Sequence, residues 1–213
     1  MTLIIITPSM LETSGPRELS EQIIQGITSP EIVDVVGIGS GIPGVIAAVN
    51  LARNIARVNI KSVTLDNISI PIYGNQEAIF FELSREPEVE IESIKNFDSK
   101  SEMEKAQLTI SVHKGDRIAT ITNQLLFKLS RNTEVKIIAS GFTIVTAVRA
   151  ILQVATSGIS REPISISGVV ATSISRRDNP SKKIAALQVY LESGHETVYP
   201  SRHSEVLQQL IKR

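Results

Sequence analysis

The chain of 213 residues contains no cysteine and no tryptophan, and only three histidines. Without cysteine there can be no disulfide framework, no thiolate metal site and no cysteine nucleophile. The histidines, His113, His195 and His203, are too few for a histidine-rich metal centre. No apolar run approaches the ~20 residues of a membrane-spanning helix, and the first residues lack the basic start of a secretory signal. We therefore expect a cytoplasmic protein with no metal, no cofactor and no membrane association.

Aliphatic residues are abundant in the chain. Hydrophobic residues make up 42% of the sequence, which is enough for a sizeable core. Isoleucine alone occurs 31 times. Together with the missing cysteine and tryptophan, this bias is typical of heat-adapted proteins and predicts a thermophilic source.

Charge is distributed unevenly although the formal net charge is zero. Residues 1–92 carry five basic and twelve acidic side chains, a net charge of −7. Residues 93–213 carry seventeen basic and ten acidic side chains, a net charge of +7. This asymmetry indicates an acidic module joined to a basic one, so overall neutrality does not argue against an anionic partner.

Hydrophobic periodicity predicts one order of elements twice, strand–helix–strand–helix–strand–strand. In the first half the strands and helices are expected at 3–7, 16–26, 32–36 and 45–58, followed by a hairpin around 73–76. In the second half they are expected at 108–112, 116–129 (capped by Asp116), 135–140 and 144–155, followed by strands at 163–174 and 184–192. An offset of 102 residues aligns Gly39 with Gly141, and a one-residue slip then aligns Leu65 with Ile166.

Two copies of one module explain this repeat better than one large fold. We expect an acidic domain at 1–92, a charged linker at 93–106, a basic domain at 107–193 and a tail at 194–213. The tail is expected to form a short amphipathic helix that begins near Ser204.

A glycine run, Gly39-Ser40-Gly41-Ile42-Pro43-Gly44, matches the pattern GxGxxG of dinucleotide-binding proteins. The second copy retains only Gly141 at the matching turn, and adjacent strands follow where a doubly wound sheet would alternate strands with helices. We therefore interpret Gly39, Gly41, Gly44 and Gly141 as structural turn residues. A small-nucleotide-binding protein that uses this turn is the less favoured alternative.

The second copy carries a basic hairpin tip, "SRRDNPSKK". Its four cations, Arg176, Arg177, Lys182 and Lys183, suit contacts with phosphates, and an arginine tip can enter a minor groove. The simpler alternative is a solubilising tip. Phe142, at the start of a predicted helix, is expected in the core, although an exposed ring there could stack on an unpaired base.

The element order, the glycine before the second helix and the basic hairpin resemble the Alba family of archaeal chromatin and RNA-binding proteins. The stretches "VKIIASGFTIVTAVRAILQVA" and "SVHKGDRIATITNQLL" carry the resemblance. Lys114 falls on a family lysine, and the resemblance places Lys114 and Arg117 on the same face as the hairpin. Family members carry arginines where this chain has Ser140 and Phe142. The resemblance implies an α/β (two-layer α+β) fold of two tandem Alba-like domains that form an intramolecular pseudo-dimer.

No histidine or hydroxyl group has a recognisable catalytic spacing, so we expect no enzymatic activity. The predicted function is DNA or RNA binding, mainly through the phosphate backbone and the second domain. Self-association or an Alba-like partner is also expected from the resemblance. The main alternative is a protein-interaction scaffold that kept the fold without binding nucleic acid.

Overall fold

The computed structural model describes residues 2–6, 10, 13–27, 32–70, 74–85, 109–131, 134–156, 160, 162–176 and 178–194. The predicted linker at 93–106 and the tail beyond Gly194 lie outside these residues, as do Arg177, His195 and His203. Below, the first unit means the described residues from 2 to 85, and the second unit those from 109 to 194.

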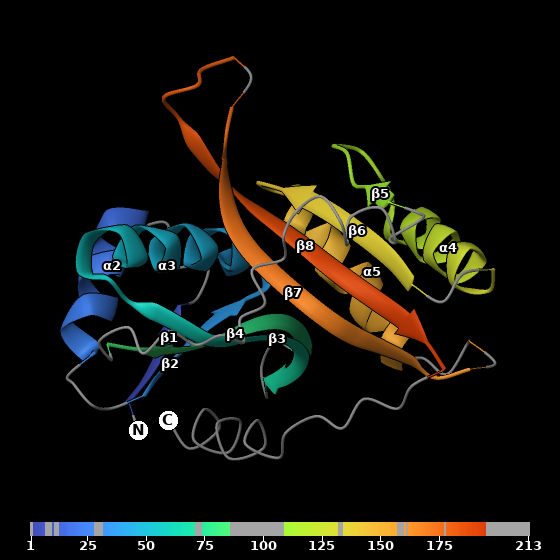
Figure 1. Cartoon of the computed structure of the whole chain (residues 1–213), viewed down its shortest axis with the longest axis horizontal. Helices are drawn as coiled ribbons and strands as arrows, with labels where there is room; N and C mark the ends of the chain where they lie inside the picture. The colour runs from blue at the N-terminus through green and yellow to red at the C-terminus, as the bar shows by residue number, and fades with distance from the viewer. Residues whose placement is uncertain are drawn as a thin grey trace.

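Each unit is a four-stranded sheet with two helices, in the predicted βαβαββ order (Figure 1). The first unit comprises β1 (Thr2–Ile6), α2 (Pro16–Gly26), β2 (Val33–Ile38), α3 (Ile42–Ala56), β3 (Asn59–Ile70) and β4 (Gly74–Ser84). The second comprises β5 (Thr109–Ser111), α4 (Ile118–Leu129), β6 (Glu134–Ser140), α5 (Thr143–Thr156), β7 (Ile164–Ser175) and β8 (Lys183–Ser193). The strand orders β1-β2-β4-β3 and β5-β6-β8-β7 are equivalent, which confirms the predicted mixed α and β fold with its internal repeat.

Helix boundaries follow local chemistry, with two corrections. α2 begins as predicted, with Gly15 as the N-cap residue and Pro16 in its first turn. α3 begins at Ile42, earlier than predicted, because a 3-10 turn at Gly39–Gly41 leads directly into it. The predicted cap of α4 was wrong: Asp116 Oδ2 instead accepts the His113 backbone N–H (2.7 Å), which closes the β5–α4 turn.

The strand pairing also corrects the alignment of the two copies. Leu65 lies in the same row of the first sheet as Gly37. In the second sheet the row of Ala139, 102 residues after Gly37, contains Ala171. Leu65 therefore corresponds to Ala171, not to Ile166. The connection between α5 and β7 is longer than that between α3 and β3, and this insertion shifts the offset from 102 to 106 residues.

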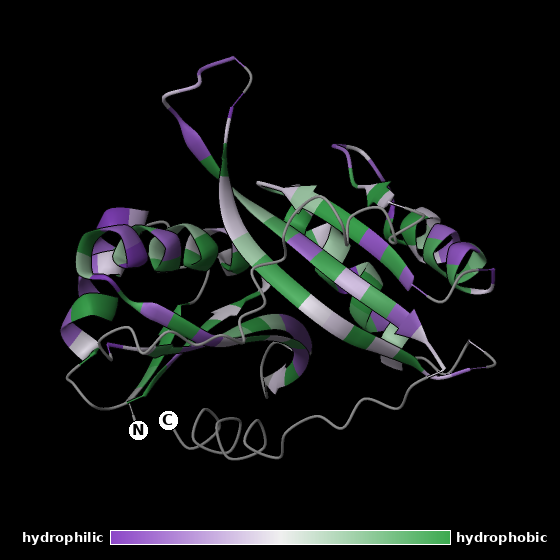
Figure 2. Ribbon diagram, in the orientation of Figure 1, coloured by the Kyte–Doolittle hydropathy of each residue, from purple (hydrophilic) through white to green (hydrophobic). Residues whose placement is uncertain are grey.

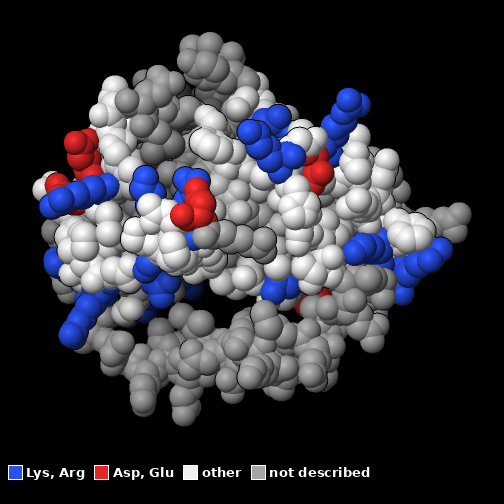
Figure 3. Space-filling model, turned by 90° about the horizontal axis from the view of Figure 1, so that it is seen from above, with Lys and Arg blue, Asp and Glu red and all other residues white. Residues whose placement is uncertain are grey.

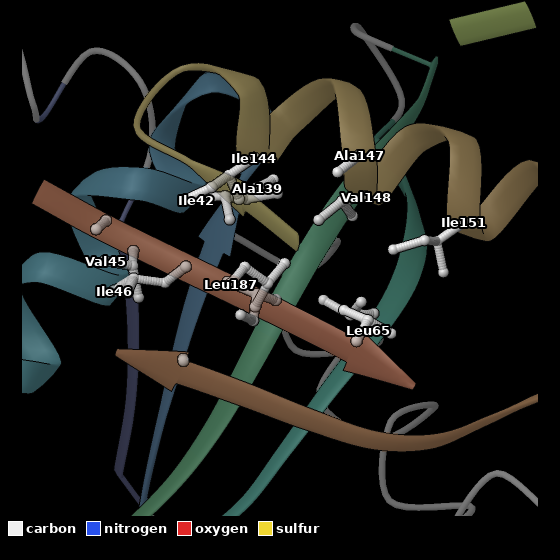
Figure 4. Packing of buried hydrophobic residues seen from close by; sticks show 14 of the residues in the cluster. Ile42, Val45, Ile46, Leu65, Ala139, Ile144, Ala147, Val148, Ile151 and Leu187 are labelled. Carbon is white, nitrogen blue, oxygen red and sulfur yellow. The ribbon is translucent and has the colours of Figure 1, made fainter. Parts of the chain in front are cut away.

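The two units share one hydrophobic core. α3 packs against β7 and β8, α5 packs against β3 and β4, and the contacts α3–α5 and β3–β7 join equivalent elements. Figure 4 shows side chains of both units pointing into one space, among them Ile46 from α3, Leu65 from β3, Val148 from α5 and Leu187 from β8. All four are almost fully buried. This reciprocal packing is the predicted intramolecular pseudo-dimer.

The outer faces of the two sheets differ. In the first sheet the face away from the helices carries a second buried apolar cluster of Val36, Ile38, Ile68, Ala78 and Phe80. The equivalent positions of the second sheet are Ile138, Ser140, Ile174, Ala186 and Gln188, from the register of its strands. The second sheet is thus more polar and more exposed on this face.

An ion pair between Arg149 and Glu77 joins the units. Arg149 of α5 donates from Nε to Glu77 Oε2 (3.2 Å) and from Nη2 to Glu77 Oε1 (2.5 Å). The Glu77 side chain is only 5% exposed, whereas that of Arg149 is 51% exposed. At the pseudo-equivalent positions the chain has Ala185 and Ala47, so the pair occurs on one side of the interface only.

Replacing Arg149 with alanine is expected to destabilise the protein, because it leaves the buried Glu77 carboxylate without its guanidinium. The half-exposed arginine admits water, so we expect a loss of about 1–3 kcal/mol rather than the larger cost of a fully buried pair. Denaturant unfolding measures this change. Arg17→Ala, which removes the exposed Arg17–Glu21 pair of α2, is the control and should change stability by less than about 0.5 kcal/mol. Equal effects of the two substitutions would contradict the role of the pair between the units.

Candidate nucleic-acid interface

Three connections of the second unit leave its sheet at one edge. β5 is parallel to β6, and β8 is antiparallel to both β6 and β7. The C-terminal ends of β5, β6 and β7 and the start of β8 therefore meet at the same edge. The β5–α4 turn (112–117), the β6–α5 turn (141–142) and the β7–β8 hairpin (176–182) all lie there. The name "hairpin edge" is used below for this edge with Lys114, Arg117, Phe142, Arg176, Lys182 and Lys183.

Backbone hydrogen bonds tie the three connections together. The Val112 N–H donates to the Ile138 carbonyl (2.9 Å), which joins the end of β5 to β6. The Gly141 N–H donates to the Ala185 carbonyl (2.8 Å), which joins the β6–α5 turn to the base of the hairpin. The described cations among those predicted from sequence are thus brought to one edge, although Lys114 and Lys183 are 69 positions apart.

The hairpin extends beyond the rest of the sheet. Pairing between β6 and β8 ends at Ser140–Ala186, whereas β7 and β8 stay paired as far as Ser175–Lys183. The hairpin therefore rises from the body as a two-stranded arm (Figure 1), and hydrophilic residues dominate its far end (Figure 2). The Arg176 N–H donates to the Lys182 carbonyl (2.9 Å), which closes the base of the tip.

An acidic side chain at the tip pairs with one of these cations. Arg176 donates from Nε to Asp178 Oδ1 (2.9 Å) and from Nη2 to Asp178 Oδ2 (2.6 Å). This hydrogen-bonded arginine holds the pKa of the Asp178 carboxyl below its ordinary value. The carboxylate therefore stays ionised at neutral pH and offsets one positive charge. Lys182 and Lys183 are exposed and make no ion pair with the described residues.

The β6–α5 turn holds a phenylalanine in solvent. Gly141 has a φ of +56°, in the left-handed region. Thr143 Oγ1 then accepts the Ser140 N–H (3.0 Å) and donates to the Ser140 carbonyl (2.9 Å). In this turn Phe142 is 96% exposed, so its predicted place in the core was wrong. Phe142 lies in the turn before α5, and the buried face of this helix begins two residues later, where Ile144 takes the core position.

The matching turn of the first unit lacks this chemistry. Gly39 has a φ of +53°, like Gly141, but Ser40 replaces the phenylalanine. Gly41 has an ordinary φ of −73°, and Gly44 lies in the first turn of α3. Sequence reasoning missed Gly37, where a Cβ atom would lie 2.6 Å from Val45 Cγ2. The glycine run therefore contains one residue for turn geometry, and the glycine just before it permits close packing of β2 on α3.

On the face seen in Figure 3, the described basic side chains lie in separate groups. Figure 3, which looks down on the side from which the hairpin rises, shows Lys and Arg in several separate groups, with acidic side chains beside some of them. Lys114 and Arg117 are exposed on the β5–α4 turn, beside Asp116. Sequence reasoning anticipated the cations but missed the Arg176–Asp178 pair. The spacing Arg-x-Asp at a turn was the available signal.

Metal-binding clusters and membrane-spanning helices were sought only in the part of the chain that the structure describes. There, no three His, Asp or Glu side chains lie close enough together to hold a metal ion. None of the helices in that part has the length and apolar character needed to cross a membrane.

Comparisons with known proteins find similarity among solved structures but none at the level of sequence. No family model matches the chain, and no curated protein matches its sequence. Among solved structures, the chain is similar to Alba from Thermoplasma volcanium, with 14% sequence identity and a TM-score of 0.34. The matched region spans 39% of this chain and 98% of the Alba chain.

Replacing Gly141 with alanine should strain the turn that presents Phe142. A Cβ atom there would meet nothing within 4 Å, so the cost is one of backbone conformation alone. We expect a loss of about 1–2 kcal/mol in the free energy of unfolding for Gly141→Ala. Gly141→Asn should lose less, because asparagine tolerates the left-handed region better. Denaturant unfolding of both variants tests this, and an alanine variant as stable as the parent would contradict it.

Proposed function

We propose that this protein binds nucleic acid, without catalysing a reaction, through the hairpin edge of its second unit. The observation that carries the proposal is the convergence of three connections on one edge. They bring together Lys114, Arg117, Arg176, Lys182 and Lys183, and one of them is an arm free of the sheet. Cations on separate short loops suit the spaced charges of a phosphate backbone better than a single small anion.

The shape of the arm agrees with this partner. A two-stranded ribbon fits a nucleic-acid groove, and its basic residues can then contact phosphates on either side. Such contacts position a protein without reading sequence, so we expect weak sequence preference. DNA and RNA both offer this backbone.

The first unit has no equivalent surface. At the start of β4 the first unit has Gly74 and Asn75 where the second unit has Lys182 and Lys183. Residues 1–92 also carry a net charge of −7. We assign it a supporting role, because its α3 packs against β7 and β8, the two strands of the arm.

Affinity for duplex DNA or structured RNA should fall steeply with salt, with a log–log slope of about −0.9 per duplex phosphate neutralised. Substituting Arg176, Arg177, Lys182 and Lys183 together with alanine should flatten that slope by about two to four units. Fluorescence anisotropy over a salt series measures the slope, and unfolding curves check that the variant still folds. If the quadruple variant binds like the parent, the tip serves as a solubilising loop and does not contact phosphates. If the parent shows no salt-dependent binding to any nucleic acid, the scaffold function replaces this proposal.

Asp178→Asn provides a matched variant that should act in the opposite direction. The substitution removes the carboxylate that pairs with Arg176 and frees a guanidinium for phosphate. Binding at low salt should become tighter and the salt slope steeper by about one unit. Because the pKa of Asp178 is lowered, mildly acidic buffer cannot replace the substitution. Weaker binding by Asp178→Asn would show that the pair orders the tip for binding rather than masking a cation.

A further inference from the structure

Phe142 is the most exposed large apolar side chain in the described part of the chain. The other large hydrophobic residues that are more than a third exposed there range from 37% to 59%, whereas Phe142 reaches 96%. Phe127, the second exposed aromatic, carries the Arg131 guanidinium 4.1 Å from its ring centre. The Phe142 ring has no such partner among the described residues, so folding gains almost nothing from it.

The backbone that carries the ring is held in a defined place. Its neighbour Gly141 is bonded to Ala185 at the base of the arm, and Ser140 and Thr143 close the turn around it. Lys183 lies two residues before Ala185, about 7 Å along the strand toward the tip of the arm. On the other side, β5 leads into the turn with Lys114 and Arg117. The exposed ring therefore lies between two groups of cations.

On the basis of the proposed function, we propose that Phe142 stacks on an unpaired base, so that the hairpin edge prefers nucleic acid with single-stranded bases over complete duplex. Every base has a π face that an aromatic side chain can cover, but in a duplex the neighbouring base pairs occupy those faces. Cations on both sides would hold the flanking phosphates. The same cations argue against an apolar protein surface as the occupant.

The chain supplies an internal contrast. Ser40 occupies the position of Phe142 in the first unit, on a turn with the same left-handed glycine. The turn itself therefore does not require an aromatic residue. Of the two equivalent turns, the one with an aromatic residue belongs to the unit that carries the basic arm.

A single tryptophan can report the stacking directly. The chain has no tryptophan, so Phe142→Trp creates one reporter at the site. We expect its emission to be quenched by an oligouridylate of about 16 nucleotides, and to change little with a duplex of equal length bound at the same salt. Unchanged emission on bound oligouridylate would overturn the inference.

Affinities separate this inference from the proposed function. Phe142→Leu should weaken binding of the oligouridylate by about 5- to 150-fold, the loss of one stacked base. Duplex affinity and the salt slope should stay within about twofold and one unit of the parent. Phe142→Tyr should bind the oligouridylate about as tightly as the parent. Phe127→Leu on α4 is the matched control and should leave the oligouridylate affinity unchanged.

Each failure has a distinct result. If Phe142→Leu binds oligouridylate like the parent while the salt dependence persists, the stacking inference is wrong and the proposed function stands. If no form binds either nucleic acid, the proposed function fails with it, and the ring would then serve a protein contact. Because Phe142 is exposed, the leucine variant should unfold at the same denaturant concentration as the parent.

Discussion

The shared core between the two units is the constraint on which the other features depend. Each hairpin packs against the second helix of the opposite unit, α3 against β7 and β8, and α5 against β3 and β4. Neither unit can bury these surfaces without the other. The basic arm is consequently held at its base by the first unit, whose α3 packs against both of its strands. In the proposed function, this support at the base would reduce the entropy that the arm loses when it binds nucleic acid.

Joining both copies in one chain allows their surfaces to differ where identical subunits could not. Glu77 and Arg149 pair on one side of the interface, and two alanines, Ala185 and Ala47, occupy the pseudo-equivalent positions. This asymmetry favours pairing of the first unit with the second over pairing of like units, because a buried carboxylate needs its partner. The turns at Ser40 and Phe142 diverge in the same way.

Much of the fold could be predicted because periodicity, turn residues and the internal offset act locally along the chain. The same left-handed φ at Gly39 and Gly141 shows that the offset of 102 residues describes a real equivalence. The alignment of Leu65 was wrong, since hydrophobic strands look alike when shifted and only the pairing with β4 and β8 selects the register. The predicted cap of α4 was wrong because the Asp116 carboxylate accepts the His113 N–H in the preceding turn and makes no capping hydrogen bond to the helix.

By itself the sequence determined the two βαβαββ copies, their opposite charges and the basic tip, since these follow from residue order and composition. Only the tertiary structure decided which side chains lie together at the hairpin edge. Parallel strands β5, β6 and β7 bring the connections that follow them together, although Lys114 and Lys183 are 69 residues apart. It also placed Phe142 in solvent, against the expectation from its hydrophobicity. A side chain's exposure depends on where the turn places it relative to the core, and the turn that begins at Gly141 ends before the buried face of α5 starts at Ile144.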